Sequence, residues 1–283
     1  MRGRARALFA AGAILASGLA LHALWLEPAS LRVVPVSLAL PRWPAACDGL
    51  RVAVLSDLHV GSPWNGTARV AEIARELARA QPELVLIAGD FVVAHGMAGG
   101  TPVPPGDVAR ELSGLRAPLG VFAALGNHDG WWGAAEVRAA LEAEGIVVLE
   151  DASLAITRGE CSFTLVGISD LWTGAHRVDA AFRGVDADAA TLALMHDPDL
   201  FPDLPPWLAL GIAGHTHGGQ FALPLLGRPV IPSKFGERFA AGHIVEGDRH
   251  YFVTTGIGTS VWPVRFRVPP EVVVLTLRST PRG

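Results

Sequence analysis

Carboxylate, histidine and amide side chains follow apolar runs at five points of the chain. These clusters occupy residues 57–59, 89–90, 126–129, 196 and 214–217. Asp57-x-His59 and His215-x-His217 each place two donors at i and i+2, and such residues project to the same side of an extended chain. Each cluster alone is most simply a turn or a hydrogen-bonded core residue. Five of them together predict one converging site.

The donor types in these clusters indicate metal chemistry. Asp, His and Asn donors without cysteine suit Mn²⁺, Fe, Zn²⁺ or Co²⁺ and argue against a structural thiolate site. The donors outnumber what one tetrahedral ion can use, so two divalent ions are expected. Two ions about 3.5–4 Å apart can activate a bridging hydroxide and hold a phosphoryl oxygen. The predicted reaction is therefore hydrolysis of a phosphate ester.

Strands must end where these donors begin. Apolar runs predict strands over 50–55, 84–88, 119–125, 191–195 and 208–213, and further strands over 146–150, 153–157, 162–168, 250–255 and 272–278. Helices are predicted over 67–80, where Val70, Ile73 and Leu77 share one face, and over 134–143. In layered α/β folds, ligand sites lie at the carboxyl ends of strands. The pattern therefore predicts an α/β domain with its site at one sheet edge.

The blocks Asp57-x-His59, Gly89-Asp90, Gly126-Asn-His-Asp129, His196 and Gly214-His-x-His217 resemble, in this order, the calcineurin-like metallophosphoesterases. The resemblance covers about residues 50–280. It implies a four-layer αββα sandwich with a binuclear metal centre at one edge of the central sheets. It further implies that the first metal is bound by Asp57, His59 and His217, the second by Asn127, His196 and His215, with Asp90 bridging the two.

Two further roles follow from the same resemblance. His128 is expected to be the histidine that protonates the leaving-group oxygen, since imidazole can supply a proton near neutral pH. Asp129 is expected to orient the His128 ring.

Residues 214–220, 256–260 and 263–271 look like the bacterial branch with an N-terminal anchor or export signal. That branch includes general phosphodiesterases and a UDP-2,3-diacylglucosamine pyrophosphatase of lipid A synthesis. Arg265 is expected either to bind the substrate phosphate through its planar fork or to form a surface ion pair. Trp131 and Trp132 are expected to pack under their loop, or else to form an apolar wall beside the site. The Gly- and Pro-rich stretch from His95 to Gly106 is interpreted as a rim over the pocket, with His95 in solvent.

The first 28 residues differ from the rest. Arg2, Arg4 and Arg6 precede an uncharged run to Leu26, about the 20 apolar residues that a helix needs to span a bilayer. An uncleaved anchor is favoured over a cleaved signal because the run exceeds the ~7–15 residues of a signal core. The positive-inside rule keeps the arginines cytoplasmic. We therefore expect a single-pass protein of a bacterial inner membrane with its catalytic domain on the periplasmic side.

Charge and composition limit the partners. The net charge is −4; residues 1–28 carry three Arg and one Glu, a net of +2, which leaves −6 for the remainder. A nucleic-acid partner is unexpected, because such binders present a basic surface. The expected partners are the membrane and a phosphate ester, either lipid-linked or nucleotide-linked.

The segment 29–49 is rich in proline and is interpreted as a linker between the anchor, 1–28, and the phosphoesterase domain, 50–280. Cys47 and Cys161 are interpreted as two separate thiols in preference to a disulfide, which an oxidising compartment would allow.

Three functions remain open at this point. The leading hypothesis is a metal-dependent hydrolase of a phosphodiester, pyrophosphate or phosphomonoester. The lipid A pyrophosphatase fits the anchor, but its substrate is made in the cytoplasm. A non-catalytic metal-binding scaffold would be expected to lack a ligand or the general acid, and the sequence has all of them.

Overall fold

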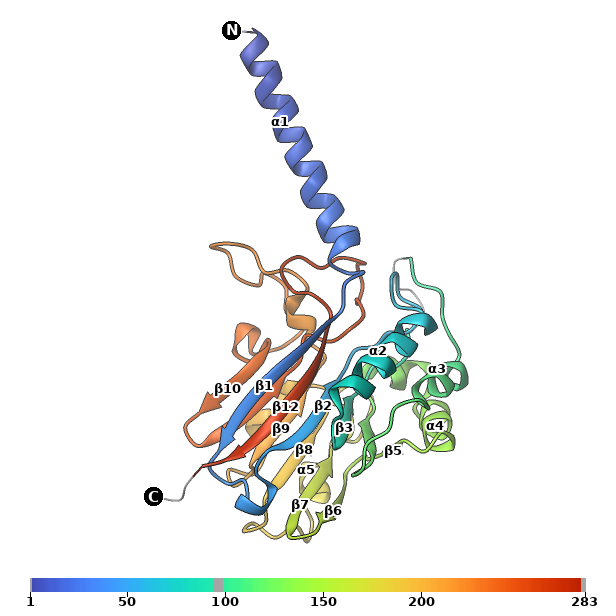
Figure 1. The fold of residues 1–283 in the computed structure, drawn as a ribbon, viewed down its shortest axis with the longest axis vertical. Helices are drawn as coiled ribbons and strands as arrows, with labels where there is room; N and C mark the ends of the chain where they lie inside the picture. The colour runs from blue at the N-terminus through green and yellow to red at the C-terminus, as the bar shows by residue number, and fades with distance from the viewer. Residues whose placement is uncertain (1, 94–98, 281–283) are drawn as a thin grey trace.

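Two six-stranded sheets form the centre of the domain. The computed structural model describes residues 2–93 and 99–280 (Figure 1). The first sheet has the order β1 (Arg32–Leu40), β12 (Glu271–Ser279), β2 (Leu50–Leu55), β3 (Leu84–Ala88), β4 (Val121–Ala124) and β5 (Val147–Val148). The second has the order β10 (Gly242–Glu246), β11 (Arg249–Val253), β9 (Leu210–Ala213), β8 (Thr191–Leu194), β7 (Cys161–Gly167) and β6 (Ala152–Arg158).

The central strands are parallel and buried on both faces. β2, β3 and β4 pair in parallel in the first sheet, as do β7, β8 and β9 in the second. The sequence of a strand covered on both faces is a continuous apolar run, without the alternation of a half-exposed strand. The run LVLIA at 84–88 fits this position, since all five residues of β3 are buried. Parallel strands also end at the same edge, so their carboxyl ends bring distant loops together.

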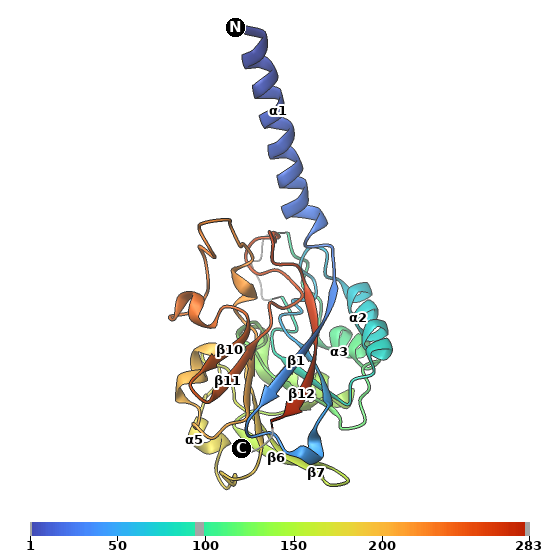
Figure 2. The same ribbon diagram turned by 60° about the vertical axis from the view of Figure 1, so that its left-hand side comes forward.

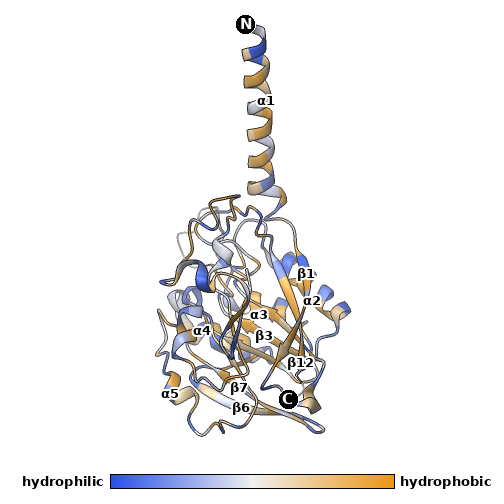
Figure 3. Cartoon of the chain, turned by 90° about the vertical axis from the view of Figure 1, so that its left-hand side faces the viewer, coloured by the Kyte–Doolittle hydropathy of each residue, from blue (hydrophilic) through white to orange (hydrophobic). Residues whose placement is uncertain are grey.

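Helices cover the outer face of the first sheet. These are α2 (Thr67–Ala80), α3 (Pro105–Leu112) and α4 (Asn127–Ala143), and α2 buries Val70, Ile73 and Leu77 as its spacing predicts. The outer face of the second sheet carries only short helical turns: α5 (Val178–Ala181), η3 (Pro198–Asp203) and η5 (Gly236–Phe239). With the apolar cluster between the sheets, the order is the four-layer sandwich that the resemblance implies. Figure 3 shows the strands mostly hydrophobic and the helices α2 and α4 partly hydrophilic.

A long apolar helix projects from one end of this sandwich (Figures 1 and 2). Helix α1 (Arg2–Leu21) continues into the π-helical turn η1 (His22–Leu26). By length and composition, Gly3–Leu26 is able to cross a membrane, and none of its most apolar stretch is buried against the protein.

The interpretation of residues 29–49 as a linker is wrong. Arg32–Leu40 forms β1, which pairs in parallel with β12 from Arg32 opposite Glu271 to Leu40 opposite Ser279. Leu38 and Leu40 are buried in the cluster between the sheets. Pro35 lies inside this strand, and β1 tolerates it because β1 is an edge strand, where a missing N–H need not interrupt a ladder. The folded domain therefore begins at about residue 32.

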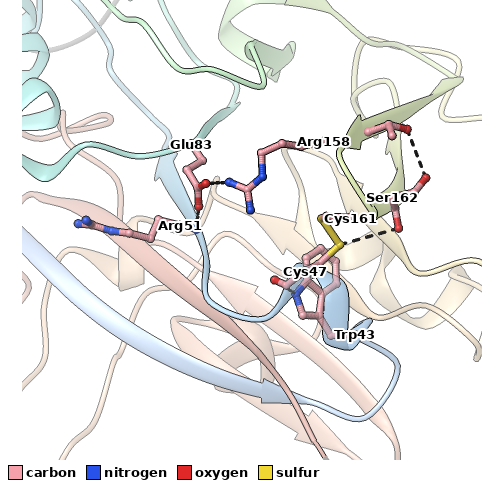
Figure 4. The surroundings of a disulfide bond; sticks show 8 residues. Trp43, Cys47, Arg51, Glu83, Arg158, Cys161 and Ser162 are labelled. Carbon is pink, nitrogen blue, oxygen red and sulfur yellow. Dashed lines mark hydrogen bonds and ion pairs between the residues drawn. A yellow bond between two sulfur atoms is a disulfide. The ribbon is translucent and has the colours of Figure 1, made fainter.

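The preference for two separate thiols is also wrong. Cys47 and Cys161 form a disulfide with a Cα–Cα distance of 4.7 Å (Figure 4). It joins the turn η2 (Ala45–Cys47), before β2, to β7 of the opposite sheet. The Trp43 indole N–H donates to the Cys47 carbonyl at 2.9 Å, and its ring packs 5.2 Å from Phe163. The bond therefore ties the two sheets together at the end remote from α1.

Candidate metal centre

The predicted donors converge at one edge of the two sheets. Asp57, Asp90 and Asn127 follow β2, β3 and β4 of the first sheet. His196 and His215 follow β8 and β9 of the second. All five side chains are buried. Because both sheets contribute parallel strand ends, the site lies across the seam between them.

A first group of donors comes from Asp57, His59 and His217. The Nε2 atoms of His59 and His217 are 3.1 Å apart. Asp57 Oδ1 lies 3.3 Å from His217 Nε2 and 3.9 Å from His59 Nε2. These three side chains form a group whose donor atoms could hold one metal ion.

A second group lies beside the first. Asn127 Oδ1 is 3.1 Å from His196 Nε2 and 3.0 Å from His215 Nδ1. Asp90 belongs to both groups, because its Oδ2 atom is 3.4 Å from His59 Nε2 and 3.3 Å from His196 Nε2. One carboxylate oxygen thus lies between two sets of donors.

Hydrogen bonds from neighbouring atoms orient these side chains. His196 Nδ1 is 2.6 Å from the Ala88 carbonyl, to which its N–H donates, and this hydrogen bond holds the ring with Nε2 directed into the site. The backbone N–H of His215 donates to Asp57 Oδ2 at 3.0 Å, and that of His128 donates to Asp90 Oδ1 at 2.8 Å. In each carboxylate, the other oxygen faces the donor groups.

The backbone at the site is strained. The five residues Asp57, His59, Asp90, His215 and His217 all have positive φ, between 41° and 66°. Such conformations cost of order 1–3 kcal/mol each in non-glycine residues and persist only where the surrounding structure holds them. Five such residues in one site indicate that the contacts of their side chains, and not their intrinsic φ/ψ preferences, set the backbone conformation there.

Burial controls the ionisation of the site. It lowers the pKa of His59 and of His215 to about 3, so both rings are neutral at pH 7 and keep a lone pair. Burial raises the pKa of Asp57 to about 6. Burial also opposes ionisation of Asp90, but the His196 charge and hydrogen bond outweigh it and hold the Asp90 pKa well below its usual value.

The donor set fits divalent cations. Asp57 Oδ1 is buried without a hydrogen-bond donor among the described residues, and it faces two neutral imidazoles. A buried carboxylate oxygen left this way is costly unless a cation neutralises it. Oxygen and imidazole nitrogen donors without thiolate suit Zn²⁺, Mn²⁺, Fe and Co²⁺.

A family model for the calcineurin-like phosphoesterases matches residues 50–219. The chain belongs to the calcineurin-like phosphoesterase family. It is therefore a hydrolase of the metallophosphoesterase type, and metal binding is a property of that family.

Curated relatives support the assignment. An uncharacterized metallophosphoesterase of Bacillus subtilis, YkuE, is 28% identical over 96% of this chain and 94% of its own length. The phosphodiesterase YaeI of Escherichia coli is 32% identical over 80% of this chain and 82% of its own. The UDP-2,3-diacylglucosamine pyrophosphatase LpxG of Chlamydia trachomatis is 36% identical, but over only 37% of this chain and 30% of its own length.

In this calcineurin-like phosphoesterase, His128 lies on the pocket side of the metal-binding groups. Its ring is 4.5 Å from the His59 ring and 4.9 Å from the Trp131 ring, centroid to centroid. Its side chain lines a cavity of about 920 Å³ together with Asp90, Asn127, His215 and His217. Burial lowers the His128 pKa. His128 therefore borders both the candidate metal-binding groups and the cavity.

Asp129 does not take the position expected for it. Its carboxylate accepts backbone N–H groups of Asp90, Phe91 and Gly126 at 2.8–2.9 Å. None of the contacts described for its carboxylate joins it to the His128 ring. The role assigned to Asp129 is corrected accordingly: it caps the amino end of α4 and fixes the loop after β3, and so positions Asp90 rather than His128.

Arg265 is likewise not placed to bind a substrate phosphate, and it forms no surface ion pair. Its side chain is 0% exposed. Its guanidinium donates to the carbonyls of Gly258, Val268 and Thr255, and Nη2 lies 3.4 Å from His217 Nδ1. Burial lowers its pKa to about 10. Arg265 therefore supports the 255–268 loop behind His217.

The two tryptophans after the Asn-His-Asp block have different environments. Trp131 is exposed and lines the cavity, whereas Trp132 packs against the helix-side core. His95, at the start of the predicted rim, lies outside the described residues.

Sequence reasoning missed Asp197 and Trp172. Asp197 Oδ2 is 3.8 Å from His215 Nε2 and accepts the Trp172 indole N–H at 3.0 Å. Burial raises the Asp197 pKa to about 6. Asp197 directly follows His196 at the end of β8, and this position could have identified it as a residue of the site from the sequence.

Proposed function

We propose that this chain is a membrane-anchored phosphodiesterase that uses two divalent ions. Asp57, His59, His217 and Asp90 would hold the first ion, and Asp90, Asn127, His196 and His215 the second. The observation that carries this proposal is the place of Asp90 Oδ2, 3.4 Å from His59 Nε2 and 3.3 Å from His196 Nε2, between the two donor groups.

When bound, the two ions supply a hydroxide nucleophile and neutralise the charge on the phosphate oxygens. The neutral rings of His59 and His215 would hold the ions, and the hydrogen bond to Ala88 keeps the His196 ring in one orientation. His128, at the cavity floor, donates the proton that the leaving oxygen needs. An anionic phosphate beside this ring favours its protonated form.

The role of His128 is tested by the leaving group. A His128→Asn variant is expected to lose roughly 10²–10⁴-fold in turnover of methyl phosphodiesters, whose alkoxide needs a proton. The loss should be much smaller for bis(p-nitrophenyl) phosphate, whose phenolate leaves without one. Metal content, measured by plasma emission, should stay at the wild-type value. A His243→Asn variant, altered on the remote strand β10, is the matched control.

Equal losses on both substrates would contradict the acid role of His128, and no loss on either would contradict its place in the site. Metal binding with no hydrolysis by the wild-type chain would contradict the proposed activity itself.

We further propose a single-pass topology in a bacterial inner membrane, with the domain on the periplasmic side. Arginines precede the apolar helix, and the positive-inside rule favours their retention in the cytoplasm. The disulfide supports the same orientation, because such bonds persist in oxidising compartments. Alkaline phosphatase and green fluorescent protein fused at the C-terminus test it. Phosphatase activity is expected, and fluorescence alone would reverse the topology.

A UDP-2,3-diacylglucosamine pyrophosphatase is the second candidate. The membrane helix and the 36% identity to LpxG over 104 residues favour it. Release of uridine monophosphate from that substrate by purified protein, together with a cytoplasmic domain in the fusion experiment, would establish it over the first candidate.

A further inference from the structure

The cavity over the metal centre combines two chemistries. Its floor consists of His128 and of donor residues that include Asn127 and His215. Its walls are mostly apolar and include Leu24, Phe221, Val230 and Trp262. A volume of about 920 Å³ is at the upper end of the range for small-molecule sites. The site thus has room for a phosphate at the floor and for hydrocarbon along the walls.

The walls offer little to a polyanion. Among the described residues that line the cavity, none is Lys or Arg. Pyrophosphates and nucleotides are commonly bound by such side chains through charge-assisted hydrogen bonds. A single phosphodiester needs no cation beyond the metal ions, so the lining favours a substrate with one phosphate and an apolar remainder.

The rim of the cavity is apolar as well. Val230, in the segment between β9 and β10, and Val261 and Trp262, in the segment between β11 and β12, line the cavity and are exposed. Leu225 and Leu226, in the same segment as Val230, are exposed as well. Trp262 remains 65% exposed. Figures 1 and 2 show both segments, in orange and red, at the end of the domain from which α1 projects. An exposed apolar group of this kind marks a membrane or ligand surface.

The anchor is part of the cavity. The Ala23 carbonyl accepts the backbone N–H of Arg265 at 3.0 Å, and the Leu24 carbonyl accepts the Trp64 indole N–H at 3.2 Å. The Trp25 and Trp64 rings are 4.0 Å apart. These contacts fix η1 on the domain, so that Leu24 belongs both to the apolar span and to the cavity wall. The cavity therefore opens where the helix leaves the bilayer.

We propose that the substrate is a phosphodiester of a membrane lipid. It enters from the bilayer with its phosphate toward the metal donors and its hydrocarbon along Leu24, Phe221 and Trp262. This rests on the proposed function and adds the class of substrate. Water adds across one P–O bond, giving a phosphomonoester and an alcohol, and the proton reaches the leaving oxygen.

A chain-length series tests the proposal. Full-length protein in nanodiscs of dioleoylphosphatidylcholine, with Mn²⁺, is assayed on p-nitrophenyl alkyl phosphates from methyl to hexyl. Burial of each methylene should raise kcat/KM by up to about fourfold, mainly through KM. Dioleoylphosphatidylglycerol mixed into the nanodiscs should then be hydrolysed as well.

Variants separate the cavity from simple partitioning of the probes into the bilayer. Trp262→Ser and Leu24→Ser are expected to flatten the chain-length slope, with at least a tenfold fall in the hexyl-to-methyl ratio. Val245→Ser, at an exposed valine of β10 away from the cavity, should keep the wild-type slope.

A flat slope in the wild type would overturn the lipid proposal while leaving the hydrolase intact. A steep slope that persists in both wall variants would also overturn it, since partitioning alone would explain the slope. Failure to cleave even the methyl ester would instead refute the proposed function.

Discussion

Removal of the disulfide should cost a large part of the folding free energy. The bond closes a loop of the unfolded chain with a sequence separation of 114 residues. For a loop of that length, the chain-entropy relation, ΔS of about −2.1 − 1.5R ln n cal/mol/K, gives about 5 kcal/mol at 25 °C. Domains are typically stable by only about 5–15 kcal/mol. The Cys47→Ala/Cys161→Ala variant is therefore expected to be marginally folded.

The assay is urea unfolding of wild type and variant in the same detergent, followed by tryptophan fluorescence, with Trp43 beside the bond as one reporter. Reduction of the wild type with dithiothreitol should reproduce the loss of stability. The variant should not respond to the reductant, which controls for other effects of the thiol reagent. A difference in unfolding free energy below about 1 kcal/mol would refute the loop-closure argument.

Two further predictions concern the metal affinity of the site and the pH dependence of stability at the strand pair β10–β11. In Gly126→Ala, the added Cβ would lie 2.3 Å from Asp90 Oδ1 and 2.7 Å from the Asp90 backbone nitrogen, so Asp90 would have to move. The Mn²⁺ affinity measured by calorimetry should therefore fall about 10–100-fold, as when other contacts that support a ligand are lost. The control Gly106→Ala, which has open space around the new methyl group, should bind Mn²⁺ with the wild-type affinity. Burial, and then the His250 charge, lower the pKa of His243 in the folded protein, so protonation of His243 favours the unfolded chain. The stabilisation by neutral His243 is complete above the pKa of the unfolded chain, about 6.5, and is lost as the pH falls through the lower pKa of the folded protein. Melting temperatures measured between pH 7.5 and 5 should therefore fall less steeply in His243→Gln than in the wild type, and parallel curves would contradict this.

Local patterns predicted most of the site. The donors could be identified because each directly follows a continuous apolar strand, and parallel strands end together. An α/β domain followed from the same alternation of apolar runs and amphipathic helices, and the four-layer sandwich followed from the family resemblance. Which ion each donor binds stays a proposal.

What the sequence did not reveal depends on contacts between distant segments. The resemblance assigned Asp129 to orient His128, but its carboxylate accepts backbone N–H groups of the loop after β3. The planar fork of Arg265 suggested a phosphate or a surface ion pair, but the guanidinium donates to backbone carbonyls of its own loop. The prolines of 29–49 suggested a linker, because proline disfavours a strand interior. An edge strand tolerates proline, but nothing local in the sequence marks β1 as an edge. Cys47 and Cys161 come together only when both sheets have formed.

The carboxyl end of the apolar helix is packed on the domain, and this limits which phosphate esters can reach the site. A flexible tether of n residues would let a catalytic domain sweep a radius of about 5–6 Å × √n. Here Glu27 is buried and accepts the Val268 N–H, and β1 begins at Arg32, so almost no slack separates the span from the sheet. With α1 in the bilayer, as proposed, the metal centre would be held at one height above the membrane surface. A phosphate ester on a long polymer, farther from the membrane surface, could reach the site only if the polymer folded back toward the bilayer.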